Sequence, residues 1–351
     1  MKVKIYGAGS IGNHYAYACR KKNWDVTIFD KDVKALERTK NKIYVSRHGK
    51  WDSKIKLLDK DNNNYYDIII IGTPPDSHLS IALNAIKFKP KVIHIEKPFC
   101  TPDLKGLKQL INKSRQSKTK IVVGYNHLHT KCVDYVRSFL KNKEKLGKIK
   151  SLYAYNKESW SGIFAAHPWL KGPQDSYLGN YKSGGGATNE HSHALNLLLY
   201  FIDFLNLGKI KKIQCYMNFI KNSSVNYDSY CNINFKTSKN CLANIIQDVT
   251  SESYEKLLII QGTKGYVKII SNYNKSNDAV EIFQKNKKII LFKKKRPDDF
   301  KGHASHLEQI AMGKIKKSPV SFQSAIKNSI ILSACYKSAI KNKQIDIDYG
   351  I

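Results

Sequence analysis

The sequence predicts an α/β amino-terminal domain with a doubly wound parallel sheet, followed by an α+β domain with a large, open, mostly antiparallel sheet. Two observations support this prediction. In the first part of the chain, short apolar runs rich in β-branched residues alternate with helical stretches, which is typical of a doubly wound parallel sheet. After Lys209, strand patterns follow one another without intervening helices. We therefore expect two domains, residues 1–126 and 127–351.

The chain begins with a strand, a glycine turn and a helical stretch. The strand Val3–Tyr6 leads into Gly7-Ala8-Gly9-Ser10-Ile11-Gly12. This is a G-x-G-x-x-G pattern in the required context, where glycines let the backbone approach a pyrophosphate at a helix N-terminus. The next strand, Asp25–Phe29, ends at Asp30, close to the spacing at which an acid receives the ribose hydroxyls. An acid there repels a 2′-phosphate, so NAD is favoured over NADP, although Lys31 weakens that preference.

Three more buried strands are predicted, at 67–72, 91–95 and 120–124. The second of them ends in Glu96-Lys97-Pro98, which places Lys97 at the carboxyl end of a strand, where ligands collect in open α/β sheets. Pro98 fixes its own φ and pushes Lys97 toward extended geometry. Lys97 is therefore a candidate substrate-binding residue, and a surface Glu-Lys pair is the alternative.

Four separated motifs of this half resemble the glucose-fructose oxidoreductase, inositol dehydrogenase and rhizopine-catabolism (Gfo/Idh/MocA) family of NAD(P)-dependent oxidoreductases. They are GAGSIG, IIIIGTPPDSH, EKP and VGYNH, in the family's order and spacing. The resemblance implies a dinucleotide-binding Rossmann domain, a catalytic Lys97, and cofactor contacts from Thr73, Pro74 and His78. It also implies that the proline of EKP is commonly cis. The other candidates of this half are Glu96 and Asn126 for the cofactor and Tyr125 for the substrate. One departure is Leu128, where many relatives carry arginine.

The second domain contains an aromatic-rich segment after the strand predicted at 147–155. Trp160, His167 and Trp169 are candidate substrate contacts, because aromatic rings stack on the apolar faces of sugars. A packed loop is the alternative.

A glycine triplet then opens the segment GGGATNEHSHALN, residues 184–196. If a helix has begun by Asn189, a rotation of about 100° per residue places Glu190 and His193 opposite the aliphatic stripe that follows. His191 falls close to that stripe and is expected to pack. We expect Glu190 and His193 to face a cleft and Asn189 to contact the substrate. A metal site is not predicted, because the two histidines lack the i, i+4 spacing of zinc helices.

In the resembled family the equivalent motif is a glycine triplet followed by Asp and His, and the sugar-modifying branch shows Ser-His. His193 then matches the catalytic histidine, Glu190 stands where Asp is usual, and Asn196 replaces a common second Asp. His193 is our candidate general acid/base, because its ordinary pKa lies near the operating pH. Lys97 would stabilise developing alkoxide charge on the same oxygen, and Glu190 would orient one or both. Whether Lys97 or His193 takes the proton stays open.

Seven strands are predicted between residues 212 and 292, with a hairpin turn at Gly262–Gly265. Helices at 302–312 and 322–341 are expected to pack back on the first domain. In relatives the exposed face of such a sheet is a dimer interface, so the resemblance implies a homodimer or homotetramer.

The formal net charge is +32, yet only six of the 60 basic residues are arginine. Because base-reading sites favour arginine, we expect no nucleic-acid partner. No apolar run approaches the roughly 20 residues that cross a bilayer, so no membrane association is expected. The chain enters its first strand at once, which leaves no room for a signal peptide. Its seven scattered cysteines fit reduced thiols, and we expect a cytoplasmic protein.

These observations favour an NAD-dependent oxidoreductase that moves hydride between nicotinamide and a secondary hydroxyl or ketone of a sugar, cyclitol or nucleotide-linked sugar. Two alternatives remain. The first is an NAD-dependent glycoside hydrolase that oxidises its substrate transiently, and the second is a non-catalytic nucleotide-binding regulator.

Overall fold

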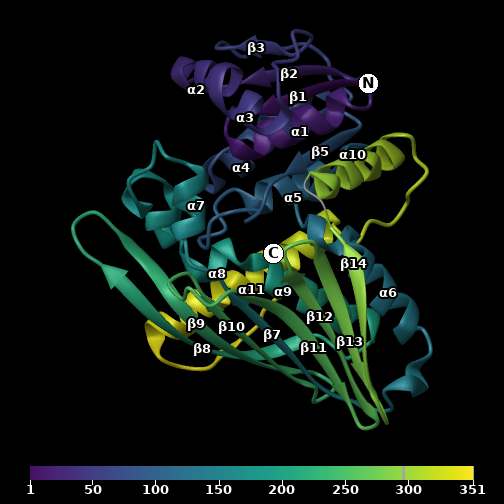
Figure 1. Cartoon of the computed structure of the whole chain (residues 1–351). Coiled ribbons are helices and arrows are strands. Elements are labelled where there is room, and N and C mark those ends of the chain that lie inside the picture. Colours follow the sequence, from purple (N-terminus) through teal and green to yellow (C-terminus); the bar gives the residue numbers. More distant parts are fainter. Residues whose placement is uncertain (295–296, 351) are drawn as a thin grey trace. The chain divides into compact units, whose positions relative to one another are not determined.

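The computed structural model describes residues 1–294 and 297–350, which form two compact units (Figure 1). Of the described residues, the first unit contains 1–100, 105–126 and 297–325. The second unit contains residues 101–104, 127–294 and 326–350. The chain therefore passes from the first unit to the second after residue 126 and later returns to the first.

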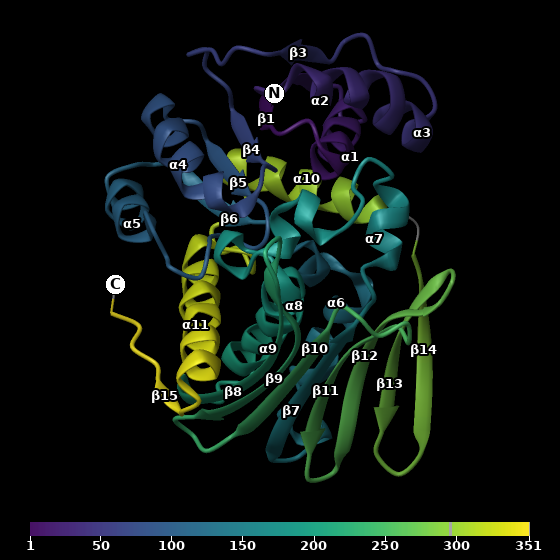
Figure 2. The same cartoon turned by 90° about the vertical axis from the view of Figure 1, so that its left-hand side faces the viewer.

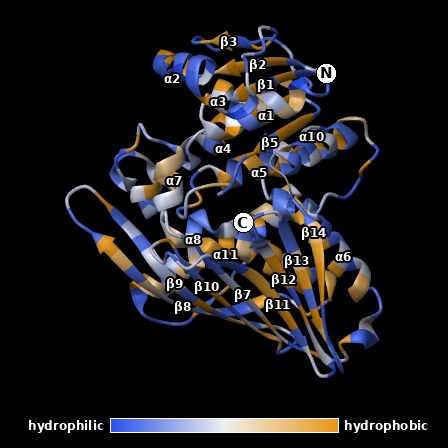
Figure 3. Cartoon of the chain, viewed as in Figure 1, coloured by the Kyte–Doolittle hydropathy of each residue, from blue (hydrophilic) through white to orange (hydrophobic). Residues whose placement is uncertain are grey.

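Six parallel strands form the sheet of the first unit, in the order β3-β2-β1-β4-β5-β6. They are β1 (Lys2–Tyr6), β2 (Asp25–Phe29), β3 (Lys56–Leu58), β4 (Ile68–Ile71), β5 (Val92–Ile95) and β6 (Lys120–Val123). All residues of β4 and β5 are buried, and both strands consist largely of apolar residues (Figure 3). This is the strand order of a Rossmann fold, in which ligands bind at the carboxyl ends of the central strands.

The first unit contains helices α1 (Ser10–Arg20), α2 (Val33–Arg38), α3 (Tyr44–His48), α4 (Pro75–Ala85), α5 (Leu107–Arg115) and α10 (Asp298–Ala311). Strand β3 and helices α2 and α3 were not predicted from the sequence. Helix α10 begins four residues earlier than predicted, with Asp298 and Asp299 in its first turn. Carboxylates are favourable there because the N-terminus of a helix carries partial positive charge.

Nine strands form the sheet of the second unit, in the order β14-β13-β12-β11-β7-β10-β9-β8-β15. They are β7 (Ile149–Lys157), β8 (Ile210–Lys221), β9 (Asn226–Thr237), β10 (Leu242–Asp248), β11 (Glu255–Gly262), β12 (Gly265–Asn274), β13 (Asn277–Phe283), β14 (Lys287–Lys293) and β15 (Ile345–Asp346). Only the pair β7 and β10 is parallel. The predicted fold class, a parallel sheet followed by an open and mostly antiparallel one, is confirmed.

The second unit contains helices α6 (Lys131–Leu140), α7 (Ser161–Ala166), α8 (Gly186–Glu190), α9 (Ser192–Phe204) and α11 (Phe322–Lys341). Helices α8, α9 and α11 lie against one face of the sheet (Figure 2). Residues 326–341 of α11 belong to the second unit. Its Tyr336 donates to Asp228 of β9 at 2.7 Å, and its Ser338 accepts from the backbone of Cys215 in β8 at 2.9 Å.

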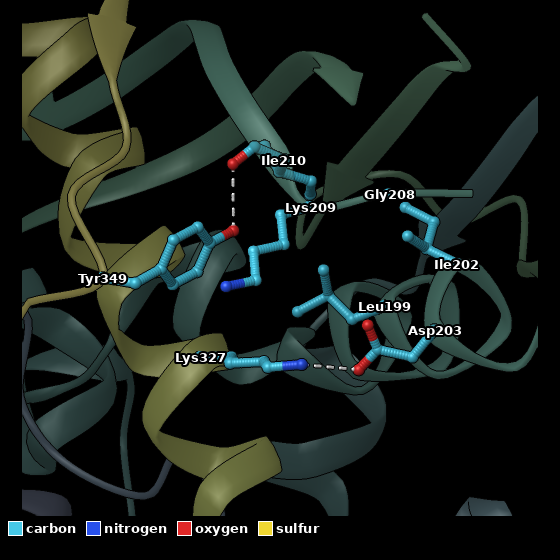
Figure 4. A pocket seen from close by; sticks show the side chains of 8 residues that line it. All are labelled: Leu199, Ile202, Asp203, Gly208, Lys209, Ile210, Lys327 and Tyr349. Carbon is cyan, nitrogen blue, oxygen red and sulfur yellow. Dashed lines mark hydrogen bonds and ion pairs between the residues drawn. The ribbon is translucent and has the colours of Figure 1, made fainter. Parts of the chain in front are cut away.

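One small cavity lies in the second unit, where Tyr349 donates to the carbonyl of Ile210 at 3.1 Å and Lys327 pairs with Asp203 at 2.8 Å (Figure 4). Its volume is about 20 Å³. That space suits a single water and not a substrate. Among the described residues, no helix combines the length and hydrophobicity needed to cross a membrane.

Candidate functional site

The glycine turn leaves open space in front of the N-terminus of α1. Gly7 has φ +103°, and a Cβ at Gly12 would lie 2.1 Å from the carbonyl oxygen of Gly7, so both positions require glycine. A Cβ at Gly9, in contrast, would meet no atom within 4 Å. Because Gly9 also provides no side-chain cap for α1, the first N–H groups of this helix can bind a phosphate.

Asp30 lies beside this turn, as predicted for the acid that receives the ribose. Its Oδ2 accepts from the backbone N–H of Ala8 at 2.8 Å, and its Oδ1 accepts from that of Asp32 at 3.0 Å. Since a carboxylate can accept about four hydrogen bonds, these two fix its orientation and leave acceptor capacity for ribose hydroxyls. The residues of the turn and Asp30 therefore fit NAD.

Arg47 of α3 is a site residue that the sequence analysis missed. Its Nη1 donates to Oγ of Ser10 at 2.6 Å and to the carbonyl oxygen of Ser10 at 3.1 Å. The guanidinium thus brings a positive charge to the N-terminus of α1. No sequence motif marks Arg47, because it is 37 residues from Ser10 and reaches it only through the fold.

His78 is fully buried between the loops that follow β4 and β5. Its ring nitrogens lie 2.7 Å from the carbonyl oxygen of Thr73 and 3.0 Å from that of Pro98. Burial lowers the pKa of His78 below its ordinary value, although its hydrogen bonds to backbone carbonyl oxygens oppose this change. His78 therefore joins the Thr73-Pro74 segment to the loop that follows Lys97, and both of its nitrogens face the backbone.

Lys97 is the second residue after the end of β5, and the Lys97–Pro98 peptide bond is cis, as the resemblance implies. Beside it, Glu96 is 7% exposed, and its Oε1 accepts from Nε2 of His94 at 3.0 Å. Its Oε2 accepts from the backbone N–H of Lys97 at 3.3 Å. Burial would raise the pKa of Glu96, but the hydrogen bond from His94 and the charges of His94 and Lys97 lower it below its ordinary value. An ionised carboxylate therefore holds the backbone of Lys97.

Two predicted contacts of this half, those of Glu96 and Tyr125, need correction. Glu96 was expected to touch the cofactor, but its oxygens accept hydrogen bonds inside the unit. Asn126, also expected at the cofactor, is part-buried and donates from Nδ2 to Oδ2 of Asp299 at 3.1 Å, and it stays a candidate. Tyr125, expected at the substrate, is 1% exposed. The side chains of Glu96 and Tyr125 are therefore enclosed, whereas that of Asn126 is part-buried.

In the second unit, the glycine-triplet segment forms two helices and not one continuous helix. The break falls at His191, between α8 and α9, where φ is −90° and ψ is 21°. His191 is 3% exposed, and its Nε2 lies 3.1 Å from the carbonyl oxygen of Asp248. The expectation that His191 packs is therefore confirmed.

His193 lies in the first turn of α9, beside a second histidine that the sequence analysis missed. Nδ1 of His193 is 2.8 Å from Nδ1 of His127, and the two rings meet edge to face at a centroid distance of 4.7 Å. Glu190, at the end of α8, accepts from the hydroxyl of Tyr177 at 3.4 Å. The signal for His127 was its place in the VGYNH motif, next to the discussed Leu128.

Asn189 faces the interior of the second unit, so its predicted contact with substrate is wrong. It is fully buried, and its Nδ2 donates to the carbonyl of Gly185 and to the hydroxyl of Tyr336, each at 2.8 Å. Asp228 lies beside it and accepts from Oγ1 of Thr188 at 2.6 Å and from Tyr336 at 2.7 Å. These hydrogen bonds anchor α8 to β9 and thereby position the residues that follow.

The aromatic segment is divided between core and surface. Trp160, predicted as a substrate contact, is 4% exposed and belongs to a hydrophobic cluster with Leu178, Ala187, Val225, Tyr227 and Val249. It therefore supports the packed-loop alternative. His167 and Trp169 lie edge to face at a centroid distance of 5.1 Å, and Trp169 is 37% exposed. These two remain candidate substrate contacts.

The fold and the site residues define a class of protein. A Rossmann sheet with an open glycine turn and an acid at the end of β2 is a dinucleotide-binding unit. Residues 1–125 match the Gfo/Idh/MocA family, described as an oxidoreductase family with an NAD-binding Rossmann fold. This match over residues 1–125 confirms the predicted resemblance, the oxidoreductase class and NAD as the cofactor. Comparison with curated proteins gives no match.

Solved structures resemble the whole chain. The WlbA dehydrogenase from Bordetella pertussis, in complex with NADH and UDP-GlcNAcA, is 16% identical with a TM-score of 0.75, and 99% of each chain is covered. Levoglucosan dehydrogenase in complex with NADH is 16% identical with a TM-score of 0.76, and 99% of this chain and 98% of that one are covered. The myo-inositol 2-dehydrogenase from Lactobacillus plantarum is 16% identical with a TM-score of 0.74, and 99% of each chain is covered. At this identity the likeness shows the fold.

Proposed function

We propose that this protein is an NAD-dependent dehydrogenase that transfers hydride between nicotinamide and a secondary hydroxyl or ketone of a sugar, cyclitol or nucleotide-linked sugar. The observation that carries the proposal is Lys97, held by an ionised Glu96 at the carboxyl end of β5 in an NAD-binding Rossmann unit. The substrate class is supported by the similar solved structures. They include a myo-inositol dehydrogenase, a levoglucosan dehydrogenase and a dehydrogenase in complex with a UDP-linked sugar.

The proposal assigns one task to each polar side chain. NAD, when bound, supplies the nicotinamide carbon that accepts the hydride. The ammonium of Lys97 hydrogen-bonds the substrate oxygen and stabilises negative charge that develops there. His193 exchanges the hydroxyl proton, since an imidazole can both accept and release a proton near neutral pH. The carboxylate of Glu190 orients these groups, and His167 and Trp169 contact the sugar ring.

We also propose that the protein acts in the cytoplasm as a homodimer or homotetramer. All seven cysteines are buried, which suits a reducing compartment. The sheet face opposite α8, α9 and α11 exposes large apolar side chains, among them Tyr153, Tyr216 and Leu242 at 38%, 54% and 57%. A second copy of the chain would cover this face.

The test is the formation of NADH, measured by absorbance, with purified protein, NAD and a panel of free sugars, inositols and UDP- or GDP-linked sugars. Lys97→Ala and His193→Ala are measured beside the wild type. We expect NADH from one substrate class and a loss of at least about 100-fold in both variants, because each removes a group that acts on the reacting oxygen.

Binding of NAD without NADH from any substrate would contradict the dehydrogenase. Release of a glycosidic leaving group without net NADH would instead support transient oxidation. Full activity of Lys97→Ala would show that the ammonium has no part in the reaction.

A further inference from the structure

The contact between His127 and His193 requires a hydrogen atom between the two rings. His127 lies in the turn before α6 and His193 in the first turn of α9, and both belong to the second unit. Two unprotonated ring nitrogens would repel each other at the observed 2.8 Å, because both would present lone pairs. One Nδ1 therefore carries a hydrogen and the other accepts it.

His127 stays neutral at physiological pH. Burial, with a smaller effect from the neighbouring His129, lowers the pKa of His127 to about 3. A neutral imidazole carries one N–H and one acceptor nitrogen. If Nδ1 of His127 is the acceptor, its hydrogen lies on Nε2, and His193 must donate from Nδ1.

We propose that His127 is a positioning residue for His193: it accepts a hydrogen bond from Nδ1–H of His193 and leaves Nε2 of His193 as the atom that exchanges a proton with substrate. This inference rests on the proposed function. In the oxidation, the C–H electron pair leaves as hydride to nicotinamide, and the hydroxyl proton moves to Nε2 of His193. The resulting imidazolium still donates from Nδ1 to His127, so the ring does not turn during the reaction.

The opposite arrangement does not serve this reaction. If His127 donated to His193, Nε2 of neutral His193 would already carry the hydrogen and could not accept one from an alcohol. In catalytic triads an acid holds the imidazole in the required tautomer, and a neutral histidine has that task here.

The tautomer of His193 can be measured without substrate. Protein labelled with ¹⁵N-histidine is examined by long-range ¹H–¹⁵N spectra, and the signals of His193 are assigned from their loss in His193→Gln. We expect the Nδ1–H tautomer in the wild type and the Nε2–H tautomer in His127→Phe, which keeps an aromatic ring but removes the acceptor. His129→Gln, in the same turn, is the matched control and should leave the tautomer of His193 unchanged. An Nε2–H tautomer in the wild type, or no change in His127→Phe, would overturn the proposal.

Activity supplies the second readout. We expect kcat of His127→Phe to fall roughly 10- to 100-fold with KM for NAD unchanged, as a part of what acid–base catalysis contributes. His127→Gln, which restores an acceptor oxygen, should recover part of this loss. Wild-type kcat in His127→Phe would overturn the proposal. If the wild type forms no NADH with any substrate, the proposed function fails. The measured tautomer of His193 still shows whether His193 donates to His127. If His127→Phe does not fold, the wild-type tautomer and His127→Gln decide it.

Discussion

Asp228 is a fully buried carboxyl group whose ionisation opposes folding. Burial raises its pKa to about 6, although hydrogen bonds from Thr188 and Tyr336 oppose the rise. The unfolded chain loses this proton near pH 4, so between about pH 4 and 6 the folded state holds a proton that the unfolded state has released. Stability from this group is complete below pH 4 and is lost as the pH rises through 6.

Asp228→Asn removes this ionisation and keeps an acceptor oxygen for Thr188, while the hydroxyl of Tyr336, which donates to Asp228 in the wild type, would accept from the new amide. We expect the free energy of unfolding of the wild type, relative to Asp228→Asn, to fall by about 3 kcal/mol between pH 4 and pH 7, since one pKa unit equals about 1.4 kcal/mol. Urea unfolding at four pH values measures this difference. Parallel pH profiles for the two proteins would show that Asp228 does not titrate in this range.

Arg47 contributes to the cofactor site through its charge and its contact with Ser10. Because the guanidinium brings a positive charge near the turn that would hold the pyrophosphate, we expect Arg47→Ala to weaken NADH binding roughly 10-fold. Arg115→Ala is the control, since Arg115 is exposed on α5 and its loss lowers the net charge equally. Fluorescence titration with NADH measures both. Equal effects in the two variants would mean that Arg47 acts only through the overall field.

At the scale of elements, the sequence was most informative where local pattern and fold agree. The β-branched runs of β4 and β5 and the glycine turn before α1 were predictable, because a buried strand and a phosphate turn each have a local signature. The break between α8 and α9 was not predictable, because the residue pattern after the glycine triplet fits a single uninterrupted helix. It arises where the backbone carbonyl of His191 accepts from Nε2 of Gln247 at 2.5 Å, from a strand 56 residues away.

Gly124, after β6, lies in close contact with the side chain of Glu96, after β5. A Cβ there would lie 2.4 Å from Oε1 of Glu96, which is buried and hydrogen-bonded. We expect Gly124→Ala to lower the free energy of unfolding by about 1–3 kcal/mol, as overpacking does, and to lower kcat by displacing Lys97. Thermal unfolding and the NADH assay measure the two effects.

Gly302→Ala is the matched control for Gly124→Ala. Gly302 is exposed within α10, where an added Cβ meets no atom within 4 Å. Alanine there should be neutral or stabilise the helix by up to about 1 kcal/mol. If Gly124→Ala behaves like Gly302→Ala, the fit between Glu96 and Gly124 is not needed for stability.

At the scale of the whole molecule, partners far apart in the sequence were beyond prediction. His127 and His193 are 66 residues apart, and Asp228 lies 40 residues from Thr188. Such pairs form only after strands and helices have packed, so neither residue type nor sequence spacing predicts them. The predicted catalytic residues Lys97 and His193 were accessible to motif reasoning, whereas the residues that hold them, Glu96 and His127, required the structure.

The open face of the nine-stranded sheet is the surface through which we expect copies of the chain to associate. On β7, Leu152 and Ala154 are buried at 0% and 1%, whereas Tyr153 between them is 38% exposed and lies on the opposite face. A stable interface buries roughly 1,200–2,000 Å² with apolar side chains at its centre, and Tyr153 is on the central strand of this face. We therefore expect Tyr153→Glu to dissociate the wild-type oligomer into monomers of 40.1 kDa.

Sedimentation velocity at several concentrations measures this dissociation. Tyr65→Glu is the control, because Tyr65 is a tyrosine of the first unit that is 51% exposed and does not lie on this sheet. The charge introduced at position 153 must leave water if a second copy covers the face, which costs several kcal/mol, whereas at position 65 it stays hydrated. A wild type that sediments as a monomer, or an oligomer that survives Tyr153→Glu, would mean that this face does not join two copies of the chain.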